Sequence, residues 1–260
     1  MIDAFTRRVL EVVQKEFPTR GFRLGEELGV ITDGKANFGM SNLWAQYQQA
    51  ALSEEDFEQA VIEKFSSALE MIDGAVQPIP EAWDDARPRL RVQLVSSKVA
   101  DVGRAVTFPF ADDVHSSLVI DCDTGYAYIS GDDLQRWEQS AVDAIEIGKM
   151  NIVQSQPALP LTVMPGETPL VAIQTGDGYD AARILIPAIR ERIIAELTGD
   201  ESGEVFVGVP NRDFLIAWPT SIDDELQQRL SETVAMDAER QSHPLSARVL
   251  RVTKEAIAIA

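Results

Sequence analysis

The most informative segment of this chain is Gly176-Asp177-Gly178-Tyr179-Asp180-Ala181-Ala182-Arg183. It follows an apolar run over 170–175 and precedes a long helical pattern that begins near Ala181. Glycine tolerates the backbone of a tight reversal, and aspartate is favoured where a helix begins. The segment therefore predicts a turn from a strand into a helix. Pro187 interrupts the helical pattern, so the helix either kinks there or restarts with proline in its first turn.

Two interpretations of this segment remain open. In the structural one, Asp177 and Gly178 make the turn, Asp180 caps the helix for about 1 kcal/mol, and Arg183 pairs with one of the two carboxylates. In the functional one, Asp177, Tyr179, Asp180 and Arg183 form a recognition surface or the polar corner of a pocket. Tyrosine and arginine are favoured anchors at binding sites, which supports the second interpretation.

The same segment also fits the G-x-G-x-x-A spacing of a dinucleotide-binding turn, through Gly176, Gly178 and Ala181. Asp180 argues against that function, because its carboxylate would occupy the anion site at the helix N-terminus and repel a pyrophosphate. The next strand also leads into a hairpin, where a dinucleotide-binding unit would place a parallel strand ending in an acid. We therefore expect no cofactor.

Hairpins followed by helices recur along the chain. Three predicted helices begin with serine followed by acids, over 53–55, 130–133 and 221–224, and each follows a predicted hairpin. The second and third copies match closely, and the first carries an extra short helix over 42–47. True repetition and chance similarity both remain open. Repetition would imply an α+β fold of antiparallel sheets with helices packed on one face.

A proline-rich segment divides the sequence. Pro78, Pro80 and Pro88 lie within 77–88, and such spacing predicts neither a helix nor a central strand. We therefore expect an N-terminal α+β subdomain over 1–76, a linker over 77–88 and a C-terminal α+β region over 89–260. The last of these contains two hairpin-helix units.

Composition narrows the classes of partner. The 260 residues carry a formal charge of -19, which repels phosphate backbones and anionic lipids, so we expect neither nucleic-acid nor membrane binding. An acidic surface suits a protein partner. A single cysteine, Cys122, fits a reducing compartment, and the N-terminus carries no pattern of a signal peptide. We expect a cytoplasmic protein, and the sequence indicates no oligomeric state.

Few residues are candidates for metal binding or catalysis. Asp112, Asp113 and His115 are weak candidates for a metal site, since oxygen and imidazole ligands occur there without a fixed metal spacing. His243 is interpreted as a loop residue. Acidic neighbours disfavour the thiolate of Cys122, which makes it a poor nucleophile. Serine-elbow, zinc-protease and phosphate-loop motifs are not found, and acid-base catalysis by carboxylates alone stays open.

Several landmarks together carry a resemblance to a known family. They are Asn42-Leu43-Trp44-Ala45-Gln46-Tyr47, the approach over 110–115 to the second hairpin, Gly176 to Leu185, Val205-Phe206-Val207-Gly208-Val209-Pro210 and His243-Pro244-Leu245-Ser246. In these the chain resembles the YtpQ-like family of uncharacterised bacterial proteins over nearly its whole length. Ala182 stands where the family suggests a serine, which weakens any role for a hydroxyl there. The resemblance implies a bacterial origin and supplies no catalytic residues.

Two hypotheses about function follow. The leading one is a non-catalytic protein-interaction or chaperone-like module, because catalytic motifs are missing, the surface is acidic and hairpin-helix units recur. The alternative is an enzyme or small-ligand binder with a polar site around Tyr179, Asp180 and Arg183. A deep pocket lined by these side chains would favour the alternative, and a fully packed segment would count against it.

Overall fold

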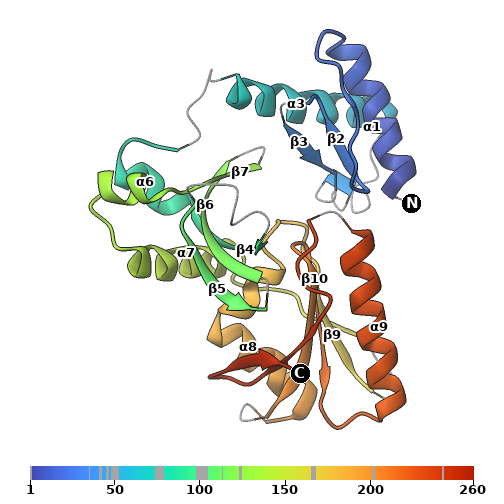
Figure 1. The fold of residues 1–260 in the computed structure, drawn as a ribbon, viewed down its shortest axis with the longest axis vertical. Coiled ribbons are helices and arrows are strands. Elements are labelled where there is room, and N and C mark those ends of the chain that lie inside the picture. Colours follow the sequence, from blue (N-terminus) through green and yellow to red (C-terminus); the bar gives the residue numbers. More distant parts are fainter. Residues whose placement is uncertain are drawn as a thin grey trace.

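Three antiparallel sheets and their helices make up the fold, which confirms the predicted α+β class (Figure 1). The computed structural model describes residues 2–34, 36–40, 43–44, 47, 53–73, 79–97, 105–112, 114–122, 125–164, 168–200, 203–241 and 243–260. Over these residues, every helix is too short or too polar to span a bilayer.

The N-terminal part packs two helices against a small sheet. Its elements are α1 (Ile2–Glu16), β1 (Arg23–Leu24), β2 (Val30–Thr32), β3 (Asn37–Gly39) and α3 (Glu54–Ile72). The apolar residues that recur at helical spacing in α3 are all buried: Phe57, Val61, Phe65 and Leu69. Of the short helix predicted over 42–47, Leu43, Trp44 and Tyr47 are described and helical, and the other three positions lie outside the described residues.

The proline-rich segment holds more helix than the sequence predicts. Residues 77 and 78 lie outside the described residues, but α4 (Trp83–Ala86) and a 3-10 turn η1 (Arg87–Arg89) follow. The expectation of no helix here is therefore wrong. A single turn fits between Pro80 and Pro88, since proline is tolerated before a helix and in its first turn.

The middle sheet contains β4 (Leu90–Ser96), β5 (Thr107–Ala111), β6 (Val114–Cys122) and β7 (Gly125–Tyr128). Strand β6 pairs with β4 along one edge, while β5 and β7 share its other edge. The β6-β7 hairpin leads into helices, as the sequence predicts. In this sheet the start of β4, the end of β6 and the start of β7 lie side by side. The candidate site described below includes these strand ends.

From its start over 130–133, the sequence predicts one helix that continues to Ile145, but the structure has two, α6 (Gly131–Arg136) and α7 (Ala141–Ser155). Ser130 caps the first in a reciprocal capping box with Asp133. The chain then breaks at Glu138, which has a positive φ of 54°. Ser140 starts the second helix by accepting a hydrogen bond from the Asp143 backbone N–H at 3.1 Å. The second cap explains why the single-helix prediction is wrong.

The C-terminal sheet has the order β13-β12-β10-β11-β9-β8. Its elements are β8 (Thr162–Met164), β9 (Leu170–Ile173), the 3-10 helix η2 (Ala181–Leu185), α8 (Pro187–Thr198), β10 (Val205–Asn211), β11 (Phe214–Pro219), α9 (Asp224–Arg240), β12 (Val249–Val252) and β13 (Ile257–Ile259). Pro187 begins α8, so the helix restarts there. The edge strands β8 and β13 were not expected from the sequence.

Buried apolar residues fall into separate cores. One core is drawn from residues 5–69, and the largest is drawn from residues 86–252 and joins the middle and C-terminal sheets. The predicted division into 1–76, 77–88 and 89–260 follows the same line along the sequence, and it stays a prediction. Helix α3 faces the ends of the middle strands and the loop after β9, where two cavities lie.

Candidate functional site

The segment after β9 turns back on itself around a buried carboxylate. Gly176 and Gly178 both have positive φ, 77° and 86°, a backbone that favours glycine. Asp180 is fully buried and accepts hydrogen bonds from the backbone N–H and hydroxyl of Thr175, at 2.9 and 2.8 Å, and from the Gly176 N–H at 3.3 Å. The carboxylate therefore closes the turn.

The predicted helix cap by Asp180 is wrong. Its backbone is already helical, with φ -59° and ψ -48°, and its side chain makes no cap hydrogen bond to the following turn. A capping residue needs an extended backbone to aim its side chain at the first N–H groups. Asp180 instead points back to the end of β9, which places it in the interior of the loop.

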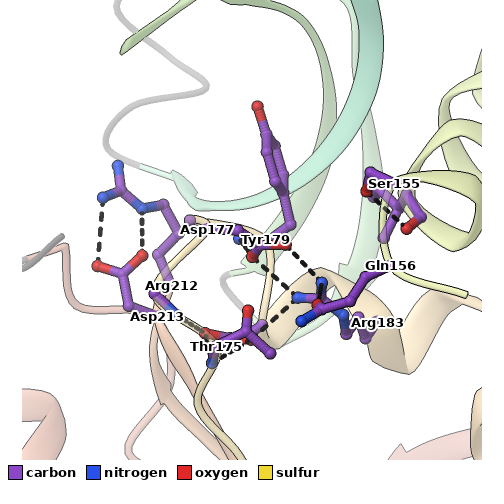
Figure 2. A network of polar contacts seen from close by, with 12 residues as sticks. Ser155, Gln156, Thr175, Asp177, Tyr179, Arg183, Arg212 and Asp213 are labelled. Atoms are coloured by element: carbon purple, nitrogen blue, oxygen red, sulfur yellow. Dashed lines mark hydrogen bonds and ion pairs between the residues drawn. The ribbon is translucent and has the colours of Figure 1, made fainter. Parts of the chain in front are cut away.

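Arg183 joins both acidic residues of the segment, and Figure 2 shows it beside Asp177. Its guanidinium is 1% exposed and donates to Asp180 at 2.9 Å, to both carboxylate oxygens of Asp177, and to the side-chain oxygen of Gln156 at 2.8 Å. The pairing expected from the sequence is present with both carboxylates. One buried cation thus balances two acids, of which Asp180 is fully buried and Asp177 is partly exposed.

Electrostatics distinguish the two carboxylates. Burial opposes ionisation of Asp177, but hydrogen bonds from Arg183 and its charge outweigh burial and lower the pKa of Asp177. Burial and the neighbouring charge of Asp177 raise the pKa of Asp180 to about 6. Both groups are therefore ionised at neutral pH, and the charge of Arg183 stabilises both carboxylates.

Tyr179 leaves this cluster in another direction. Figure 2 shows its ring pointing away from Arg183, and its hydroxyl donates to Asp121 at the end of β6, at 3.0 Å. Burial and the charge of Asp121 raise the pKa of Tyr179, so the phenol stays protonated. Burial also raises the pKa of Asp121, although Tyr179 and Arg91 oppose that change.

A cavity of about 490 Å³ opens beside this loop. Its wall comes from four places: α3, the start of β4 with η1, the β6-β7 hairpin and the glycine-rich loop. The lining side chains and backbone that matter here are Lys64, Arg89, Arg91, Gln93, Asp121, Cys122, Tyr126 and Gly176 to Tyr179. Of the predicted site residues, Asp177 and Tyr179 line the cavity, whereas Asp180 and Arg183 support its wall from inside.

Two polar groups of the lining, Oε1 of Gln93 and the Lys64 ammonium, have no hydrogen-bond or ion-pair partner among the described residues. The Gln93 side chain is fully buried, and its Nε2 donates to the Gly178 carbonyl at 2.9 Å. That bond fixes the amide orientation and leaves Oε1 with no hydrogen bond from any described residue. Lys64 has no ion pair or hydrogen bond within the described part of the chain, and burial and the charge of Arg212 lower its pKa.

A second cavity of about 350 Å³ shares Lys64, Gly125 and Tyr126 with the first. Arg212 lies in its wall, forms a two-bond ion pair with Asp213 at 2.9 and 3.2 Å, and donates to the Tyr126 hydroxyl at 3.0 Å. The two cavities therefore adjoin along α3, and Lys64 contributes to both.

His243 lines this second cavity and packs on Gly39 of β3. Burial and Arg212 lower the pKa of His243 to about 4, so its ring is neutral at physiological pH. Its description as a plain loop residue misses this contact between the N-terminal sheet and the loop before β12.

The described members of the weak metal candidates, Asp112 and His115, belong to no metal-ligand group. Asp112 pairs with Arg248 at 3.0 Å, Asp113 lies outside the described residues, and His115 is held in β6 with Nδ1 buried. Over the described ranges, no three His, Cys, Asp or Glu side chains are grouped as metal ligands would be. The sequence-based candidates therefore form no common site among the described residues.

Sequence reasoning missed Lys64, Arg89, Arg91 and Gln93. A signal for the last existed, because Gln93 interrupts the otherwise apolar run Val92 to Val95. An uncharged polar residue within such a run is expensive to bury without a partner. The cations gave no such signal, since Lys64 lies far from Arg89 and Arg91 in the sequence.

One curated bacterial protein is similar to this chain. It is UPF0354 protein MW1686 of Staphylococcus aureus (strain MW2), 26% identical over 171 residues, which make up 60% of this chain and 58% of the relative. The match thus spans somewhat more than half of that protein, and it supports a relation to an uncharacterised bacterial family. No family model and no solved structure matches the chain.

Proposed function

We propose that this protein binds a small polar molecule in the cavity beside the glycine-rich loop. The observation that carries the proposal is Gln93, which lines the cavity and whose buried side-chain oxygen has no hydrogen-bond partner among the described residues. An unpaired buried polar atom costs about 1–3 kcal/mol, and native proteins rarely retain one without a use. A bound molecule with a hydroxyl or amine would satisfy it.

The loop supports this role because some of its residues hold the turn rigid and others line the cavity. Asp180 and Arg183 rigidify the turn from within, and Asp177 and Tyr179 form the lining. A preformed wall lowers the entropic cost of binding. This arrangement favours the small-ligand alternative for the segment over a flat recognition surface.

We propose binding without catalysis. Among the described lining residues the carboxylates are Asp121 and Asp177, and each is already engaged, by the Tyr179 hydroxyl at 3.0 Å and by Arg183 at 3.0 Å. A general base needs a carboxylate oriented toward the substrate proton. Here the oxygens serve neighbouring side chains.

The single cysteine provides the test, because Cys122 lines the cavity. Its alkylation by iodoacetamide is followed by mass spectrometry with and without a deproteinised small-molecule extract of bacterial cells. Binding is expected to slow alkylation of the wild-type protein. Gly125→Trp is the matched control: a Cβ at Gly125 meets no atom within 4 Å, so the added ring partly fills the rim and should abolish the protection. Equal rates with and without extract would refute the proposal.

A second candidate function, a protein-interaction or chaperone-like role, is favoured by a surface on α7. Val142, Met150 and Val153 are 67%, 49% and 41% exposed, and the last two line an apolar groove of about 250 Å³ with Ile186 and Pro187. Exposed apolar side chains grouped in this way are typical of docking surfaces.

Pulldown from bacterial lysate tests this second function. Met150→Glu should release any partner that docks on α7, while Met236→Glu on α9, at a residue of similar exposure (43%), should not. Equal capture by both variants would count against the surface.

We further propose that the chain belongs to the YtpQ-like family and acts in the cytoplasm, in line with its landmarks and its single cysteine.

A further inference from the structure

Among the described residues that line the larger cavity, basic side chains outnumber acidic ones, although the protein is strongly acidic. Lys64, Arg89 and Arg91 line it together with Asp121 and Asp177, of which Asp177 already pairs with Arg183. The chain as a whole carries -19. Cations gathered at one concave place on such a surface attract a small anion there, while the surrounding acids repel extended polyanions.

The cations differ in how firmly they are engaged. Arg89 donates through Nε to the Asp121 carbonyl at 3.0 Å and through one terminal nitrogen to the Cys122 sulfur at 3.4 Å. Arg91 lies 3.9 Å from the Asp121 carboxylate. Lys64 approaches from α3 and has no ion pair with any described residue. An ammonium that is partly removed from water without a counterion favours a bound anion.

We propose that the cavity binds the oxyanion of a small molecule, a carboxylate or a phosphate, through Lys64 and Arg89 beside Cys122. A hydroxyl or amine of the same molecule donates to Oε1 of Gln93. This inference rests on the proposed binding function and names its ligand class. Arginine suits such ligands, because its planar guanidinium matches the geometry of oxyanions.

Two alkylating reagents of nearly equal size test the oxyanion directly. Iodoacetate carries a carboxylate, and iodoacetamide carries a neutral amide. In both reactions the Cys122 thiolate forms a carbon-sulfur bond, iodide leaves, and the thiol proton is lost to solvent. The ratio of the two rates cancels the thiolate fraction and the exposure of the sulfur. It reports the attraction of the cavity for an anion.

The ratio of iodoacetate to iodoacetamide rates is expected to be about 5- to 10-fold higher in the folded protein than in urea, the effect of one nearby cation at intermediate dielectric. Lys64→Gln should reduce the ratio several-fold. Lys15→Gln, which removes the same charge from an exposed position on α1, should not. A folded ratio at or below the unfolded one, or a ratio indifferent to Lys64, would overturn the proposal.

Lys64→Met serves as a second variant if Lys64→Gln melts early, since it keeps an apolar stem of similar length.

A competition experiment distinguishes the two oxyanions. Gluconate, glucose 6-phosphate and glucose share a hydroxylated carbon chain, and only the first two carry an oxyanion. The carboxylate or the phosphate compound should slow iodoacetamide at Cys122 in the wild type and less so in Lys64→Gln. Protection by glucose equal to that by both anions would overturn the oxyanion.

Failure here and failure of the proposed function give different results. If the cell extract protects Cys122 while the reagent ratio stays at its unfolded value, the cavity binds a molecule of another class. If the extract gives no protection in the wild type, the binding function itself fails. Both measurements use the full chain and the same cysteine.

Discussion

Replacing Arg183 by methionine should destabilise the protein strongly. The guanidinium is 1% exposed and is the cation shared by Asp177 and Asp180. Without it, two carboxylates remain side by side, one of them fully buried. Removing one partner of a buried ion pair costs about 3–5 kcal/mol, a large share of the roughly 5–15 kcal/mol that stabilises a typical domain.

The variant should also change the pH dependence of folding. The folded-state pKa of Asp180 is already raised to about 6, and loss of Arg183 raises it further above the unfolded value. A carboxyl with a raised folded pKa binds its proton more tightly in the folded state, so its ionisation lowers stability as pH rises through the interval between the two pKa values. Arg183→Met should therefore recover part of its lost stability between pH 8 and pH 5.

Urea unfolding at several pH values measures both effects. Arg251→Met is the control, because Arg251 is about half exposed and lies 3.7 Å from Glu204, a contact worth at most about 1 kcal/mol. The double variant Arg183→Met with Asp180→Asn should lose the pH dependence. A cost below about 1 kcal/mol for Arg183→Met, with a flat pH profile, would refute the role given to this cluster.

Three further predictions concern the cavity walls. Gly39→Ala should lower the free energy of unfolding in urea by about 1–3 kcal/mol, because the new Cβ would lie 2.2 Å from Nε2 of His243. Gly131→Ala is the control and should change stability little, because a Cβ there meets no atom within 4 Å. Equal effects of the two variants would contradict the contact. The His243 ring signals in NMR should titrate near pH 4, so the stability that this neutral ring contributes is lost as pH falls from about 6.5 toward 4, and a midpoint near 6.5 would contradict its burial. Gln93→Leu should leave stability within about 1 kcal/mol, since it removes the unpaired oxygen along with the bond to Gly178, yet it should abolish protection of Cys122 by the extract; retained protection would exclude the amide from binding.

Short-range sequence patterns predicted most of the helices and strands and the turn before Asp180, but they could not predict contacts between distant segments. Asp180 and Arg183 are three residues apart, so their pairing follows from helical spacing. The direction of the Asp180 side chain does not, because it depends on free N–H groups at Thr175 and Gly176 that only the folded loop presents. Ser140 and Asp143 form a second helix cap within the predicted helix, and this pattern indicates the break between α6 and α7.

The cavity illustrates the limit most clearly. Lys64, Arg89 and Gln93 come from a helix, a 3-10 turn and a strand, and only the packing of α3 against the middle sheet brings them to one space. The edge strands β8 and β13 were missed for a different reason. Each has only three residues, mostly exposed, so neither shows the alternation that predicts a strand.

The most direct test of the central claim is the rate at which iodoacetamide alkylates Cys122 with and without the small-molecule extract. The cavity beside the Gly176–Arg183 segment predicts slower alkylation of the wild-type protein and no change in Gly125→Trp. An unchanged rate in the wild-type protein would contradict a ligand-binding role for this cavity.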